Sequence, residues 1–221
     1  MAKLQSSFMN MALSLTCIAL VAAGALAGVY MLTMAPIEAA MKAKQEAAIM
    51  QVLPQVEGLQ VAEAEDANGI TLYKAYVGEE WVGTAVEAST EGNANMPFGG
   101  TFRLMVGFDK VGNIVNYVVL EQAETPSLGA LMTTWFKNAD KPGQNILGKN
   151  PATTEFGVSK DGGDVDAITA STITSRAFLE VVVKAYNAIA HQDVEAVSSA
   201  TQLGESGDEA TSELEEKGGQ Q

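Results

Sequence analysis

The chain has 221 residues, of which 13 are Lys or Arg and 27 are Asp or Glu, so its formal net charge at pH 7 is −14. This length fits one globular domain with additions, and so acidic a composition argues against a nucleic-acid partner, whose phosphates need a basic surface. A single cysteine and a single histidine cannot provide a disulfide, an iron–sulfur cluster or a bis-histidine haem site within this chain. Any redox function must therefore use an organic cofactor.

The first predicted element is a membrane-spanning helix at residues 9–34, after a short N-terminal segment at residues 1–8. No charged residue occurs in 9–34, and about 20 apolar residues are enough for a helix to cross a bilayer. A cleaved signal peptide is the alternative, since 25–27 reads Ala-Leu-Ala, like a signal peptidase site. The apolar run continues to Leu32, beyond the roughly 7–15 residues of a signal core, which favours a retained anchor.

A helical stalk is predicted at residues 35–54, because this segment is dense in strong helix formers. Pro54 is expected to end it. Charged residues flank the apolar span on both sides, so the positive-inside rule barely decides the orientation in the membrane.

Four strands are predicted next, at 70–77, 81–88, 101–108 and 114–122, because these segments are rich in Val, Tyr, Phe and Thr. The sequence at 109–113 is typical of a hairpin turn, so the last two strands should pair antiparallel.

The second half of the predicted domain, 55–192, contains a short helix at 128–137, a short strand at 157–159 and a closing helix that begins near Thr172. Strands followed by a closing helix indicate an α+β fold, with a largely antiparallel sheet and flanking helices. No Gly-x-Gly-x-x-Gly fingerprint follows the first strand, which disfavours a Rossmann unit. The acidic tail at 193–221 is predicted to be disordered and to carry no chemistry.

A hydroxyl-rich turn precedes the closing helix. Its Ser and Thr residues are Thr169, Ser171, Thr172, Thr174 and Ser175. The first N–H groups of a helix lack intrahelical partners, so an anion can be held there without a basic side chain. The common alternative is that one hydroxyl simply caps the helix. The residues alone leave both interpretations open.

A second turn, Glu124-Thr-Pro-Ser-Leu-Gly129, follows the fourth predicted strand. Pro126 fixes its backbone, Gly129 permits the close approach of a ligand, and Thr125 offers a hydroxyl. Taken alone, it is typical of an ordinary strand-to-helix turn.

Together the two turns resemble the signatures of the FMN-binding domain family. The segment Asp166-Ala-Ile-Thr-Ala-Ser-Thr172 is similar to the family's flavinylation motif, Asp-x-x-(Ser/Thr)-Gly-Ala-Thr, and the upstream turn is similar to Glu-Thr-Pro-Gly-Leu-Gly. The chain departs from these patterns at Ser127, Ala170 and Ser171, which stand in place of Gly, Gly and Ala. Ala170 has less access to positive φ than glycine, which matters if the loop needs that conformation.

The resemblance implies that Thr172 carries FMN through a phosphoester bond, which an external flavin transferase installs once. Ser171 is the alternative attachment, because it places a second hydroxyl beside the acceptor. The other implied cofactor-binding residues are Asp166, Thr169, Ala170 and Ser171 in the loop, Ile173 and Thr174 at the phosphate, and Glu124, Thr125, Leu128 and Gly129 beside the ring or ribityl chain. Trp135 and Phe136 are expected either to pack in the core or to cover the flavin ring.

Within this family, the chain is most similar to the G subunits of Rnf electron-transport complexes, which couple electron transfer between ferredoxin and NAD to ion translocation. The C subunits of sodium-translocating NADH:quinone reductases share the domain and are the nearest alternative. The resemblance implies an electron relay that works with other membrane and peripheral subunits, with its main domain on the extracytoplasmic side of the inner (plasma) membrane. A stand-alone exported flavoprotein reductase and a non-redox anchored binding module are further alternatives.

Overall fold

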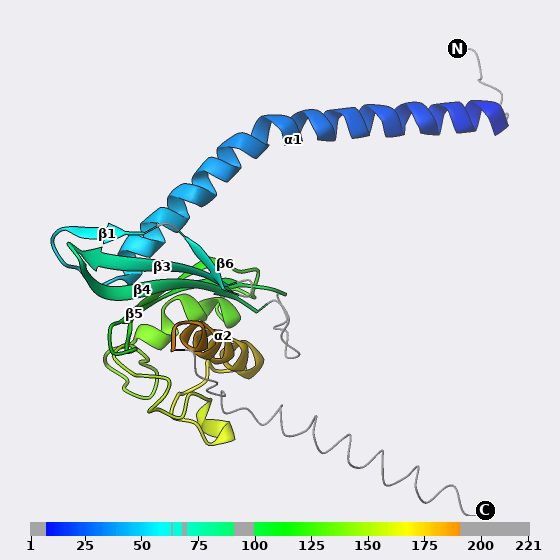
Figure 1. Cartoon of the computed structure of the whole chain (residues 1–221). Helices are drawn as coiled ribbons and strands as arrows, with labels where there is room; N and C mark the ends of the chain where they lie inside the picture. Colours follow the sequence, from blue (N-terminus) through cyan, green and yellow to red (C-terminus); the bar gives the residue numbers. More distant parts are fainter. Residues whose placement is uncertain (1–7, 63, 68–69, 91–99, 191–221) are drawn as a thin grey trace, which may run out of the picture. The chain divides into compact units, whose positions relative to one another are not determined.

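The computed structural model describes residues 8–62, 64–67, 70–90 and 100–190 (Figure 1). The predicted acidic tail and the predicted N-terminal segment, apart from its last residue, lie outside the described residues. The chain divides into two compact units, Met1–Glu46 and Ala47–Gln221. Each unit is described by itself.

Helix α1, Phe8–Val52, contains the predicted span and nearly all of the predicted stalk without interruption, with Pro36 inside it. It is long and apolar enough to cross a membrane, and the side chains of its most apolar part are not buried by the chain itself. These properties fit a single-pass membrane protein, because a bilayer would cover the exposed apolar surface.

The described residues form one antiparallel sheet of six strands. The strands are β1 (Leu59–Val61), β2 (Glu65–Ala67), β3 (Ile70–Val77), β4 (Glu80–Ser89), β5 (Arg103–Asp109) and β6 (Ile114–Glu121). Their order is β1-β3-β4-β5-β6, and β2 also pairs with β3. Strands β3 to β6 confirm the four predicted strands. Strands β1 and β2 were not predicted, since three residues are too few to show an alternating pattern.

The predicted hairpin between β5 and β6 is confirmed. The Asp109 N–H donates to the Asn113 carbonyl oxygen at 3.0 Å, and the Asp109 carboxylate accepts the N–H groups of Val111 and Asn113 at 2.8 and 2.9 Å. One short side chain therefore holds the turn and fixes the antiparallel register of the pair.

Helices cover both faces of the sheet, as Figure 1 shows for α2 (Thr172–Ala190) and the end of α1. Leu104 and Val106 of β5 share a hydrophobic cluster with α2, whereas Met105 belongs to a second cluster with Val52 at the end of α1. Successive side chains of a strand point to opposite faces, so β5 is buried on both. This arrangement confirms the predicted α+β fold.

Two predicted elements differ from the structure. Instead of one helix at 128–137, the chain forms two 3₁₀ helices, η1 (Gly129–Thr133) and η2 (Trp135–Lys137). The hydroxyls of Thr133 and Thr134 donate to the carbonyls of Ala130 and Leu131, and such bonds compete with regular helix formation. The predicted strand at 157–159 is reduced to isolated bridge residues at 157 and 158, and Val158 pairs in parallel with Val165.

We expect Gly107→Ala to destabilise the domain by about 3 kcal/mol, the upper part of the usual range for overpacking a core. A Cβ at Gly107 would lie 1.9 Å from the Val52 carbonyl oxygen, so the end of α1 would have to leave the sheet. Urea unfolding of the full chain in detergent, followed by tryptophan fluorescence, measures the loss.

Gly58→Ala is the control for this substitution. Gly58 has φ of +79°, and no atom lies within 4 Å of a Cβ added there. The Gly58→Ala substitution should lower the free energy of unfolding only by the backbone strain, about 1 kcal/mol. Equal losses for the two variants would contradict the close packing of α1 on β5.

Candidate functional site

The hydroxyls at the start of α2 lie at different depths. The helix begins at Thr172, as predicted. Thr174 and Ser175 are buried, with 1% and 0% of their surfaces exposed, and they lie one turn before the buried ring of Phe178. Thr172 is half-buried and Ile173 is 37% exposed. The amphipathic face of α2 therefore turns two hydroxyls inward and leaves Thr172 at the surface.

The inward hydroxyls hold the loop together. Ser175 Oγ accepts the Ile168 N–H at 2.9 Å and donates to the Ser171 carbonyl oxygen at 2.9 Å. Ser171 Oγ donates to Thr174 Oγ1 at 2.9 Å, and Thr174 Oγ1 donates to Glu124 Oε2 at 3.1 Å. Ser171, Thr174 and Ser175 thus each have a structural role.

The hydroxyl of Thr172 makes no hydrogen bond to any described residue. Among the same residues, no backbone or side-chain oxygen accepts the N–H groups of Thr172, Ile173 or Thr174. A side-chain cap, the common alternative for this turn, is therefore not formed within the described part of the chain. The helix start presents one hydroxyl and a set of unbonded N–H groups, as an anion site requires.

The two departures from glycine in the motifs keep the glycine conformation. Ala170 has φ of 59° and Ser127 has φ of 62°, and they are the only non-glycine residues with positive φ in the described ranges. A residue with a Cβ adopts this region at a cost of about 1 kcal/mol. Both loops therefore use the left-handed conformation, which Ala170 and Ser127 adopt at a higher cost than glycine would.

The upstream turn is joined to α2 through Glu124. This carboxylate is 7% exposed and accepts the hydrogen bond from Thr174, which lies 50 residues away in sequence. A Cβ at Gly129 would lie 2.2 Å from Glu124 Oε2, so only glycine leaves room for the buried carboxylate. The Thr125 carbonyl accepts the N–H groups of Leu128 and Ala130 at 3.1 and 3.3 Å, which closes the turn.

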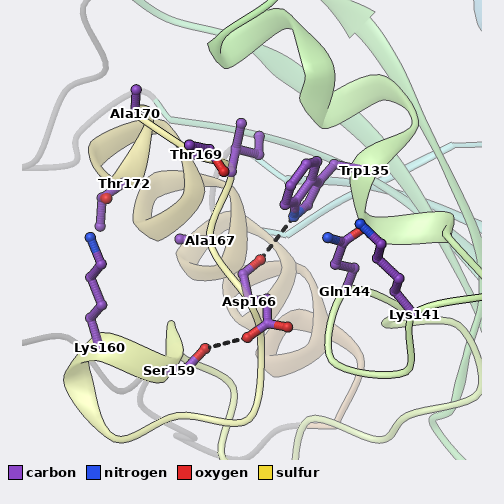
Figure 2. Close-up of a pocket in the computed structure, with 11 residues that line it drawn as sticks. Trp135, Lys141, Gln144, Ser159, Lys160, Asp166, Ala167, Thr169, Ala170 and Thr172 are labelled. Atoms are coloured by element: carbon purple, nitrogen blue, oxygen red, sulfur yellow. Dashed lines mark hydrogen bonds between the residues drawn. The ribbon is translucent and has the colours of Figure 1, made fainter.

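A pocket of about 440 Å³ opens beside the hydroxyl-rich loop (Figure 2). Four predicted site residues line it: Asp166, Thr169, Ala170 and Thr172. The other predicted site residues do not line it: Ser171, Ile173, Thr174, Glu124, Thr125, Leu128 and Gly129. Of these seven, three lie at the start of α2 outside the pocket, and the other four belong to the turn after β6 that supports the helix.

Asp166 organises one wall of the pocket. Its carboxylate accepts a hydrogen bond from Ser159 Oγ at 2.8 Å, and its carbonyl accepts one from Trp135 Nε1 at 2.9 Å (Figure 2). A Cβ at Gly143 would lie 2.4 Å from Asp166 Oδ2, so this glycine also makes room for a carboxylate. Trp135 lines the pocket, whereas Phe136 is fully buried and stacks on Phe178 with ring centroids 4.4 Å apart.

Two lysines that the sequence did not single out, Lys141 and Lys160, line the pocket. In Figure 2 the Lys160 side chain extends toward Thr172, and Lys141 lies on the opposite wall beside Gln144. Neither ammonium forms an ion pair with an acidic residue in the part of the chain that the structure describes. Only the folded chain brings Lys160 beside the hydroxyl-rich turn, which explains why sequence reasoning expected an anion site without a basic side chain.

The left-handed conformation of Ala170 gives a direct test of this loop. We expect Ala170→Gly to change the free energy of unfolding by less than about 0.5 kcal/mol, because relief of strain offsets the greater flexibility of glycine in the unfolded chain. Ala185→Gly, in α2, should cost at least about 1 kcal/mol from helix propensity alone. Urea unfolding compares the two, and equal losses would show that residue 170 does not adopt positive φ.

The chain is similar to known proteins over most of its length. Residues 98–187 match the family model of the FMN-binding domain, and residues 1–52 match that of the RnfG N-terminal region. The G subunit of the ion-translocating oxidoreductase complex of Haemophilus influenzae (strain PittEE) is 31% identical over 158 residues, which cover 68% of this chain and 75% of that protein. The protein of the same name from Methanosarcina acetivorans is 29% identical over 181 residues, covering 80% and 91%. The chain therefore belongs to the family of G subunits of ion-translocating oxidoreductase complexes and contains its FMN-binding domain.

Proposed function

We propose that this chain is the electron-relay subunit of an Rnf-type membrane complex and that its FMN is esterified to Thr172. The observation that carries the proposal is the unbonded Thr172 hydroxyl at the start of α2, on the wall of a pocket that also contains Lys160. FMN, when bound, supplies the electron-carrying chemistry, while the protein holds and orients it. The electrons would pass between ferredoxin and NAD through the other subunits of the complex.

The residues present fit the phosphate of FMN. Thr172 offers the oxygen to be esterified, and the N–H groups of Thr172 and Ile173 offer donors that lack acceptors in the described chain. The positive end of the α2 dipole and the nearby ammonium groups favour a negative charge at this point. Trp135, fixed by its hydrogen bond to Asp166, offers a rigid aromatic surface in the same pocket.

Thr172 also fits the acceptor role better than its neighbour. Ser171 Oγ is hydrogen-bonded to Thr174 and so points into the chain of contacts that ends at Glu124. Esterification of Ser171 would break that chain, whereas esterification of Thr172 would not. These contacts support Thr172 as the attachment site.

The attachment step requires an activated flavin nucleotide, in which the flavin phosphate is joined to a nucleotide leaving group by a phosphoanhydride bond. Thr172 Oγ1 forms a bond to the flavin phosphorus, the phosphoanhydride P–O bond breaks, and the nucleotide leaves with that bridging oxygen. The proton of the Thr172 hydroxyl passes to a base of the flavin transferase. The transferase acts once, and Thr172 takes no further part as a nucleophile.

We further propose that α1 stays as a membrane anchor and places the FMN-binding domain on the extracytoplasmic side. A covalent tether suits that location, because a dissociated cofactor would be lost from the cell and could not readily be replaced. A stand-alone reductase is the second candidate. It predicts a protein that stays active without other membrane subunits, whereas a relay should co-purify with them.

Thr172→Ala should abolish flavin fluorescence of the protein band in a denaturing gel, after co-production with a flavin transferase. Ser171→Ala should retain it, because Ser171 contributes a supporting hydrogen bond and no ester oxygen. Thr172→Ser should also retain fluorescence, since it keeps the hydroxyl. Full fluorescence of Thr172→Ala would refute the assignment, and peptide mapping would then locate the modified residue.

The orientation can be tested with single cysteines in a Cys17→Ser background. Ala152 is exposed in the FMN-binding domain, so Ala152→Cys should react with a membrane-impermeant maleimide in spheroplasts. Gln5→Cys, on the other side of the apolar span, should react only after lysis. The reverse labelling pattern would place the domain in the cytoplasm.

A further inference from the structure

Lys160 belongs to a short segment that is held firmly on both sides. It is the middle residue of η3 (Ser159–Asp161). On one side, the Ser159 hydroxyl shares its one proton between Asp166 Oδ1 at 2.8 Å and the Val165 carbonyl oxygen at 3.0 Å. On the other side, Asp161 is bound by Arg176. The backbone that carries Lys160 is therefore fixed against the acceptor loop and against α2.

The contact between Arg176 and Asp161 is a two-point ion pair. Arg176 Nε lies 2.6 Å from Asp161 Oδ2, and Arg176 Nη2 lies 2.8 Å from Asp161 Oδ1. The Asp161 side chain is 2% exposed, and its hydrogen bond and charge raise the pKa of the Arg176 guanidinium. Bidentate pairs of this kind are geometrically specific. The pair also neutralises the acidic side chain next to Lys160 in sequence, which would otherwise attract the ammonium.

Helix α2 thus fixes the positions of both Thr172 and the segment that carries Lys160. Thr172 is its first residue, and Arg176 lies one turn later. Through Asp161, the helix that presents the Thr172 hydroxyl also holds the segment from which Lys160 extends toward Thr172 (Figure 2). In a chain with a net charge of −14, an ammonium without an acidic partner in the described ranges is available to an external anion.

We propose that Lys160 binds the phosphate of the Thr172-linked flavin and that the Arg176–Asp161 pair positions it there. This inference rests on the proposed function and adds a residue that the family motifs do not include. A phosphate diester carries one negative charge, which one ammonium balances. Lys160 donates to a non-bridging phosphate oxygen, beside the N–H groups at the start of α2. The same contact stabilises negative charge on the phosphoryl group while the ester forms.

The test compares rates of flavinylation for full-length variants co-produced with a flavin transferase, measured as in-gel fluorescence over time. Lys160→Gln should slow flavinylation by about tenfold or more, since about tenfold is the lower end of the effect of losing one hydrogen bond to a charged group. Lys160→Arg should retain most of the rate, because it keeps the charge. Lys110→Gln is the matched control, since Lys110 is exposed and pairs with Glu80 at the hairpin turn.

A second measurement separates phosphate binding from recognition by the transferase. The ³¹P resonance of the diester in loaded wild-type protein should move as salt is raised from low to high concentration. In loaded Lys160→Gln the resonance should start at a different position and respond less to salt, because the screened contact is absent. Arg176→Gln should slow flavinylation as well, since Asp161 would then compete for Lys160. If that variant does not fold, the Lys160 variants and the salt dependence still decide.

The outcomes separate the two levels of the proposal. No fluorescence of the wild-type protein would refute covalent attachment itself. Normal attachment at Thr172 together with wild-type rate and ³¹P behaviour for Lys160→Gln would refute only the role of Lys160. Lys141→Gln is measured in the same way. If it slows flavinylation while Lys160→Gln does not, the phosphate belongs to the opposite wall of the pocket, and the inference is likewise overturned.

Discussion

The site depends on the hydrogen bond between the buried Glu124 carboxylate and the Thr174 hydroxyl. A buried carboxylate is costly unless polar groups satisfy it, so Glu124 requires both a donor and space. Thr174 is a donor, and Gly129 leaves the space. Because Thr174 lies in the first turn of α2, this contact ties the start of the helix to the turn that follows β6. The position of Thr172 and its N–H groups follows from it.

Several structural elements meet at the pocket, and each is held there by a different kind of contact. The start of α2 is held by hydroxyl hydrogen bonds, and the apolar face of the same helix packs on the sheet. The wall around Asp166 is held by Ser159 and Trp135, and η3 is held by an ion pair. These contacts hold the pocket walls in one arrangement. A relay benefits from such rigidity, because the position of the flavin relative to its partners sets the electron-transfer distance.

The sequence was sufficient for the long elements and insufficient for the contacts. Alternating strands, the Asp109 turn and the apolar face of α2 are local patterns, so they could be predicted from local residues. The start of α2 at Thr172 was also predictable. The pocket was not, since Lys141 and Lys160 reach it from segments that only the tertiary fold brings together. The same holds for Glu124, whose hydrogen-bonding partner is 50 residues away.

The positive φ values of Ala170 and Ser127 also bear on how such proteins are recognised. The loops constrain a backbone angle, and glycine is only the residue that meets this constraint at the lowest cost. A sequence pattern that insists on glycine tests for the cheapest solution and rejects chains that use another. A chain with Ala or Ser at these positions can keep the left-handed conformation, as this one does. A survey for FMN-binding domains of this kind should therefore weigh the surrounding hydroxyls and the buried glutamate above the glycines.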